Sequence, residues 1–100
     1  MKKYLLKVSA IEIKGKCPVY KLGNNFSVRD GYILNTNITL CMHSLTSIMP
    51  YYIPLSRGIT PENLGLGKEN RAYVQCLDPC DYTNGGTVVF EIKIEEDNVG

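Results

Sequence analysis

Residues 87–95, Thr-Val-Val-Phe-Glu-Ile-Lys-Ile-Glu, form the most regular pattern in the chain. One side of this segment is apolar and consists of Val88, Phe90, Ile92 and Ile94. The alternate positions, 89, 91, 93 and 95, are mostly charged. Because successive side chains of a β-strand point to opposite faces, the pattern predicts a strand with one buried and one solvated face.

Residues 3–13 and 26–34 predict the next strands. The first segment alternates until Ile11 and Ile13, where the phase slips, which predicts a β-bulge or burial on both faces. Phe26 and Val28 share one face of a short strand that runs into Asp30-Gly31, a strong hairpin signal. Residues 32–34 then form the return strand or pack against it.

Residues 71–77 predict a strand whose inward side chains are Ala72, Val74 and Cys76. Residues 78–86 form a polar loop that leads into the segment 87–95. The two strands that flank this loop are expected to form a hairpin. The strand over residues 3–13 is expected to pair near the last strand.

Residues 38–56 are the expected helix, with N-cap side chains offered by residues 35–37. Its apolar stripe faces a sheet and consists of Cys41, Leu45, Ile48 and Tyr52. Pro50 is expected to kink or restart the helix, because proline lacks the backbone donor, and Pro54 and Gly58 to end it. Thr60-Pro61-Glu62-Asn63 predicts one further helical turn.

These segments together predict an α+β fold: a four- to five-stranded, mostly antiparallel sheet with one main helix packed on it. The length of 100 residues predicts one small domain over residues 1–100.

The charge distribution and the hydropathy narrow the classes of partner. The formal net charge is +1 and the basic residues are spread along the chain, which argues against nucleic acid as the main partner. No apolar stretch reaches the length of a signal peptide or a membrane span. We therefore expect a cytoplasmic protein without a membrane partner, whose cysteines are thiols, thiolates or metal ligands.

Cys17 and Cys41 are the first two of four candidate sulfur ligands. Cys17 follows Lys16 in a turn with further lysines nearby, and positive charge favours the thiolate. Its alternative role is a small apolar residue under a turn. Cys41 lies in the helix stripe, where either core packing or a thiolate stabilised by the first helical turn is expected.

Cys76 and Cys80 are the other two, with Asp78 between them as a supporting residue. A C-x-x-x-C spacing at a strand end can converge on one metal, although C-x-x-C is the usual zinc spacing. The acidic neighbours of Cys80 disfavour its thiolate unless a metal is present. His43, the one histidine, faces away from the stripe and is expected to be exposed.

Three arrangements of the cysteines remain open. One is a metal site formed by Cys17, Cys41, Cys76 and Cys80, which holds zinc or an iron–sulfur cluster. Another is a redox pair, either Cys76 with Cys80 or Cys17 with Cys41. The third is that the cysteines form no site and serve as packing residues.

A wider set of positions resembles the pattern of a family of short uncharacterised cysteine-containing proteins from anaerobic bacteria and methanogenic archaea. These positions are Gly15-Lys16-Cys17-Pro18, Leu22-Gly23, Phe26, Val28, Leu40-Cys41, Pro50, Gly58 and Cys76-Leu77-Asp78-Pro79. The resemblance implies that Cys17, Cys41, Cys76 and Asp78 are the site residues and that Cys80 is less central. It implies an anaerobic setting, which suits an oxygen-sensitive cluster or a reactive thiol, and it implies no activity.

The first functional hypothesis is a small cytoplasmic cysteine-ligated metal protein, zinc or iron–sulfur, or a redox accessory protein. The alternative is a non-catalytic protein-binding or assembly module with core cysteines, whose partner is a second copy or another protein. Seven tyrosines favour this alternative, with Tyr51-Tyr52 beside two prolines as an aromatic surface. A thiol enzyme with Cys17 as the nucleophile is a third hypothesis, so the sequence leaves open whether the protein is an enzyme.

Overall fold

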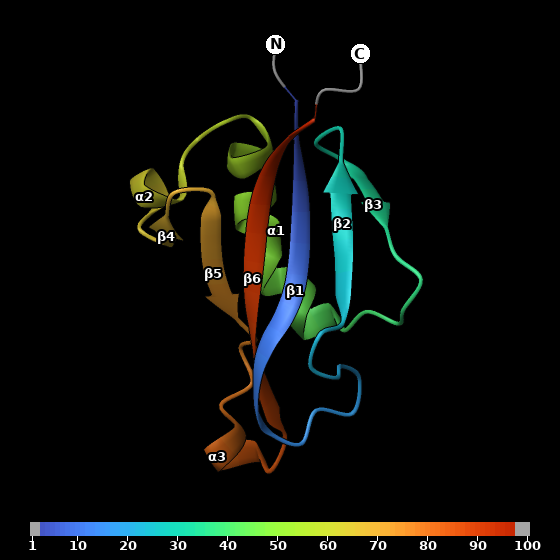
Figure 1. The fold of residues 1–100 in the computed structure, drawn as a ribbon. Coiled ribbons are helices and arrows are strands. Elements are labelled where there is room, and N and C mark those ends of the chain that lie inside the picture. The colour runs from blue at the N-terminus through green and yellow to red at the C-terminus, as the bar shows by residue number, and fades with distance from the viewer. Residues whose placement is uncertain (1–2, 98–100) are drawn as a thin grey trace.

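The computed structural model describes residues 3–97, which form one six-stranded antiparallel sheet and three helices (Figure 1). The strands are β1 (Lys3–Gly15), β2 (Asn25–Arg29), β3 (Ile33–Asn35), β4 (Gly67–Lys68), β5 (Arg71–Gln75) and β6 (Gly86–Asp97). The helices are α1 (Met42–Ser56), α2 (Pro61–Leu64) and α3 (Cys80–Thr83). The α+β class is confirmed, but the expected count of four to five strands is too low, because β4 has only two residues and carries no alternation to detect.

The sheet has the order β3-β2-β1-β6-β5-β4, so the first and last strands of the chain lie at its centre. β1 pairs with β6 from Lys3 opposite Asp97 to Gly15 opposite Gly86. The pairing predicted for the first and last strands is therefore confirmed, and so is the hairpin of β5 with β6.

The predicted bulge in β1 is present. The register shifts between Ala10 and Glu12, which makes Ile11 the extra residue. Ile11 points to solvent, whereas Ile13 returns to the inner face and packs against the core. The two isoleucines therefore do not share a face, because one inserted residue reverses the alternation.

β2 and β3 form the predicted hairpin around Asp30-Gly31. Both turn residues have positive φ, 57° for Asp30 and 85° for Gly31, and the Tyr32 N–H donates to the Arg29 carbonyl (3.2 Å). Aspartate and glycine adopt this left-handed conformation more readily than other residues, which explains their presence here. The hairpin forms one end of the sheet, with β3 as the outermost strand.

α1 begins later than the sequence predicts. Cys41 is its N-cap, in an extended conformation, and the Cys41 side chain makes no capping bond. Residues 35–37 do not cap the helix, and the Thr36 hydroxyl bonds to the backbone of Ile38 instead. The start is fixed from outside the helix, because the Tyr20 hydroxyl accepts the N–H of Cys41 (3.0 Å).

α1 also continues through both of its prolines. Pro50 and Pro54 lie inside the helix, and it ends only at Ser56. The structure therefore contradicts a restart of the helix at Pro50, whereas the helical region ends at residue 56, as predicted. Ile48 precedes Pro50 and Leu55 follows Pro54, and their exposed fractions are only 3% and 0%. The burial of these side chains offsets the backbone hydrogen bonds that the two prolines cannot donate.

α1 covers only part of one face of the sheet. It packs mainly on β1, β5 and β6, and Figure 1 shows β3 lying clear of it. The buried side chains of this layer include those predicted to face inward: Ala72, Cys76, Val88, Phe90 and Ile92. Six strands about 4.8 Å apart are wider than one helix about 10 Å across, so a single helix leaves strands uncovered.

The remaining elements are short: α2 and β4 lie at the edge of the sheet away from β3, and α3 lies in the connection between β5 and β6. α2 starts as predicted, with the Thr60 hydroxyl accepting the Asn63 N–H (3.2 Å), and Gly65 ends it in the left-handed conformation. β4 pairs with β5 at the edge of the sheet. α3 is a single turn within the segment predicted to be a polar loop.

We expect the substitution Pro50→Ala to stabilise the protein by about 1–2 kcal/mol, because alanine restores a backbone donor in the helix interior, where proline costs about 3 kcal/mol. Part of this gain is lost because alanine makes the unfolded chain more flexible. Urea unfolding followed by circular dichroism measures the change. Pro18→Ala, in a loop, is the control and should give no gain. A loss of stability in the Pro50 variant would contradict the continuous helix.

Candidate functional site

A buried hydrogen-bond network joins the loop before β2 to the start of α1. The Tyr20 hydroxyl lies 2.6 Å from the Ser44 hydroxyl and also accepts the N–H of Cys41 (3.0 Å). Ser44 donates to the Cys41 carbonyl (2.7 Å). Tyr20 and Ser44 are only 4% and 0% exposed, so the bond between their hydroxyls is buried, and the two bonds to the Cys41 backbone are partly buried. The network therefore fixes where α1 begins.

Cys17 and Cys41 lie on either side of this network. The Tyr20 N–H donates to the Cys17 sulfur (3.3 Å), and the Tyr20 ring meets Phe90 edge to face at 5.3 Å between ring centroids. Both cysteines are half-buried and pack against the core. The neighbouring Lys16 is exposed, so its positive charge lies on the solvent side of this loop, whereas Cys17 is half-buried.

Cys76 and Cys80 both lie near the start of β6, but in different surroundings. Cys76 is buried in the core, and its N–H donates to the Val88 carbonyl (2.8 Å). Cys80 begins α3 and is half-buried, with its sulfur 3.9 Å from a carboxylate oxygen of Asp81. Since Cys76 fills space beside apolar side chains, packing accounts for its position.

Asp78 holds the β5–β6 connection together. Its carboxylate accepts the Thr83 hydroxyl, and its carbonyl accepts the Thr87 hydroxyl. The Gly85 N–H donates to the same Thr83 oxygen (3.2 Å), and a side chain at Gly85 would collide with the Asp78 carboxylate. Asp78 was predicted to support a metal site, but in this structure it stabilises the connection between β5 and β6 through these hydrogen bonds.

The donor set does not fit a metal or an iron–sulfur cluster in this arrangement. Within residues 3–97, no three His, Cys, Asp or Glu side chains are grouped so that they could hold a metal ion. The predicted ligands Cys17, Cys41, Cys76 and Cys80 are free thiols that the fold does not gather into one site. A four-thiolate site stays a prediction and requires these side chains to move. His43 is exposed, as expected.

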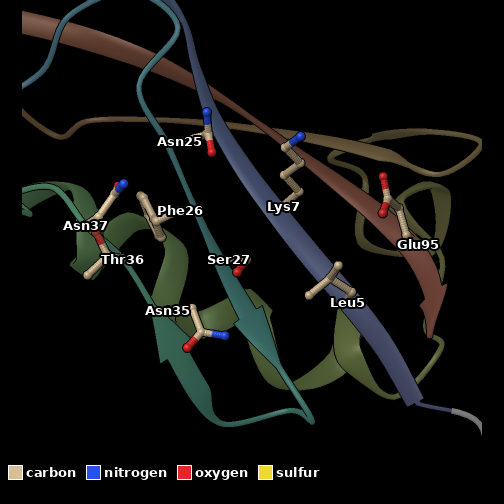
Figure 2. Close-up of a pocket in the computed structure, with 9 residues that line it drawn as sticks. All are labelled: Leu5, Lys7, Asn25, Phe26, Ser27, Asn35, Thr36, Asn37 and Glu95. Carbon is tan, nitrogen blue, oxygen red and sulfur yellow. The ribbon is translucent and has the colours of Figure 1, made fainter. Parts of the chain in front are cut away.

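The uncovered face of the sheet carries a shallow polar trough of about 550 Å³ (Figure 2). Its lining comes from β1, β2, β6, the end of β3 and the segment after it, and consists of Leu5, Lys7, Asn25, Phe26, Ser27, Asn35, Thr36, Asn37 and Glu95. Several of its polar groups are engaged locally: Asn25 donates to the Gly23 carbonyl, and Glu95 pairs with Lys93 at 3.5 Å. Glu95 in this trough lies on the solvated face that the alternation of residues 87–95 predicts.

The inner face carries an apolar groove of about 440 Å³ between α1 and the β2–β3 hairpin. We call this feature the α1–β3 groove, and its lining is Phe26, Val28, Tyr32, Leu34, Leu45, Ile48, Met49, Tyr52 and Ile53. No lining residue is charged. Four of them remain well exposed, with exposed fractions of 77% for Tyr32, 46% for Leu34, 49% for Met49 and 54% for Ile53.

The groove arises because Leu34, which lies opposite Val28 on the inner face of the sheet, is only partly covered, whereas Val28 itself is buried in the core. Sequence reasoning identified only one of its residues: of the predicted aromatic surface Tyr51-Tyr52, Tyr52 lines the groove and Tyr51 does not. A usable signal was present in α1 itself: residues 42–56 contain no Asp, Glu, Lys or Arg. A helix on the surface of a globular protein normally has charged or polar residues on its outer face.

No protein-family model, curated protein or solved structure matches this chain. The family resemblance drawn from the sequence therefore stays a prediction. Among the described residues, no helix is both long enough and apolar enough to span a lipid bilayer.

We expect Tyr20→Phe to destabilise the protein by about 1–3 kcal/mol, because it removes the partner of the buried Ser44 hydroxyl and the acceptor of the partly buried Cys41 N–H. The measurement is the free energy of unfolding in urea. Tyr32→Phe is the matched control, since Tyr32 is largely exposed, and it should change stability by less than about 0.5 kcal/mol. Equal effects of the two substitutions would show that the network does not fix α1.

Proposed function

We propose that the protein is a non-catalytic protein-interaction module, and that its α1–β3 groove binds the apolar face of a helical protein segment. The observation that carries the proposal is the uncharged apolar lining of a groove whose rim side chains are about half exposed or more. Exposed apolar surface of this kind is costly in water, and in soluble proteins it commonly marks an interaction site.

The composition of the groove favours a protein segment over a small metabolite. Small-molecule sites combine apolar walls with a few converging polar groups that fix the ligand. The α1–β3 groove offers only the hydroxyls of Tyr32 and Tyr52 among its side chains. Met49 at the rim adds an unbranched side chain that adapts to differently shaped apolar partners.

The shape of the layer favours a helix as the bound segment. α1 lies on β1, β5 and β6, and the neighbouring strands β2 and β3 continue the sheet beyond it. Helices packed on one face of a sheet lie about 10 Å apart, and Phe26 and Val28 of β2 are already buried, so the next position beside α1 falls towards β3, where Leu34 is exposed. A partner helix there would complete the second layer of the fold.

A cytoplasmic location is part of this proposal. Its support is that all four cysteines are free, which suits a reducing compartment. In this proposal the cysteines pack the core and the end of the sheet rather than perform chemistry.

We expect a fluorescein-labelled amphipathic peptide, with leucines on one helical face and lysines on the other, to bind the protein saturably. Fluorescence anisotropy measures its affinity at micromolar protein. Ile53→Asn should weaken binding at least tenfold, because it places a polar group in the groove wall that the peptide would desolvate. The substitution adds no charge that could attract the lysines.

Leu77→Asn is the matched control for this titration. Leu77 is 57% exposed and lies outside the groove, against 54% for Ile53. The proposal predicts unchanged affinity in the control. Failure of the wild-type protein to bind, or equal weakening by both substitutions, would refute the groove as the binding site.

Metal analysis separates this proposal from the cysteine-ligated alternative. We expect protein purified without oxygen or added chelator to be colourless, folded and free of stoichiometric metal, because the ligand side chains are not grouped. The measurement is elemental analysis together with an absorption spectrum. One zinc per chain, or an iron–sulfur band, lost on Cys17→Ser and Cys76→Ser, would overturn the interaction-module proposal.

A further inference from the structure

The exposed surface of α1 continues the apolar character of the groove. Met42, Met49 and Ile53 are 64%, 49% and 54% exposed. Their spacing of seven and four residues places them on one side of the helix. Met49 and Ile53 belong at once to this stripe and to the wall of the α1–β3 groove.

We infer that the occupant of the groove is α1 of a second copy of this chain, with the two α1 helices antiparallel across a two-fold axis. This inference rests on the proposed function and names its partner. In a two-fold interface the same patch is used by both subunits. Each chain must therefore carry exposed apolar side chains and, next to them, a groove that accepts the same side chains of the other copy. The stripe and the groove meet this requirement, because they share Met49 and Ile53.

The charges around the patch suit pairing with an identical surface. Two copies of a charged patch would repel one another, whereas α1 has no Asp, Glu, Lys or Arg between Met42 and Ser56. The lining of the groove from β2 and β3 is also uncharged. Within the groove lining and α1, an identical surface therefore brings no like-charged Asp, Glu, Lys or Arg side chains together.

The exposed apolar area of the patch suits a weak, reversible dimer. The exposed parts of Tyr32, Leu34, Met49 and Ile53 amount to roughly 450 Å² at about 200 Å² for a large side chain. A stable interface buries about 800 Å² per partner, so these four side chains supply about half of it. Met42 and the unpaired outer edge of β3 extend the same surface.

Sedimentation velocity of the untagged protein, from low micromolar to millimolar concentration, tests the inference. The expected result is a reversible monomer–dimer equilibrium with a dimer mass of twice 11.2 kDa. Ile53→Glu should raise the dissociation constant at least tenfold, because each dimer would bury two carboxylates near the axis. Leu77→Glu, at a comparably exposed site outside the groove, should leave it unchanged, and circular dichroism verifies that both variants fold.

Isotope-filtered NMR on a mixture of labelled and unlabelled chains locates the interface. Contacts between the Met49 methyl of one copy and Ile53 of the other are expected for antiparallel α1 helices. A monomer at all concentrations, a dimer insensitive to Ile53→Glu, or a dimer without these contacts would overturn the inference. In the first case, peptide binding by the monomer still tests the proposed function separately.

Discussion

The pairing of β1 with β6 is the constraint on which the other elements depend. These strands come from opposite ends of the described chain and form the centre of the sheet. Their inner faces supply Leu6, Val8, Phe90 and Ile92, which are almost completely buried beneath α1. The β2–β3 hairpin extends the sheet from β1, and β5 and β4 extend it from β6. The β1–β6 contact joins residues that are far apart in sequence. During folding, the entropic cost of bringing them together must therefore be met before most of the apolar side chains can be buried.

The single long helix determines which part of the inner face stays accessible. α1 is held at its start by Tyr20 and Ser44 and near its end by Leu55, so its position over β1, β5 and β6 is fixed. In this position α1 leaves Leu34 beside it and partly exposed, although Val28 on the neighbouring strand is buried. The apolar groove is therefore a consequence of one helix covering a sheet that is wider than a helix.

The sequence predicted those features that local patterns encode. Alternation identified the buried faces of the long strands, the phase slip at Ile11 identified the bulge, and Asp30-Gly31 identified the hairpin. The start of α1 could not be predicted in this way, because it depends on the hydroxyl of Tyr20, a residue 21 positions earlier in the chain. The effect of Pro50 could not be read from local sequence for a related reason. The tertiary burial of Ile48 and Leu55 outweighs the local cost of proline in a helix interior.

The site was predicted less well than the fold. Cysteine counting drew attention to Cys17, Cys41, Cys76 and Cys80, but counting carries no information on whether their side chains converge. The groove instead depends on where α1 lies over β2 and β3, which no local pattern specifies. The absence of charge along α1 was the one readable clue, and it acquires meaning only once the neighbouring strands are in place.

The antiparallel β1–β6 pair also determines how the fold responds to mechanical force. Lys3 lies opposite Asp97, so the outer ends of the two central strands are adjacent (Figure 1). Tension applied through both ends of the described chain would load this first pair alone, and the backbone hydrogen bonds would then open one after another like a zipper. A cellular unfolding machine that pulls on both ends would therefore meet low resistance, whereas a pull along β2 or β5 against a central strand would load many bonds at once.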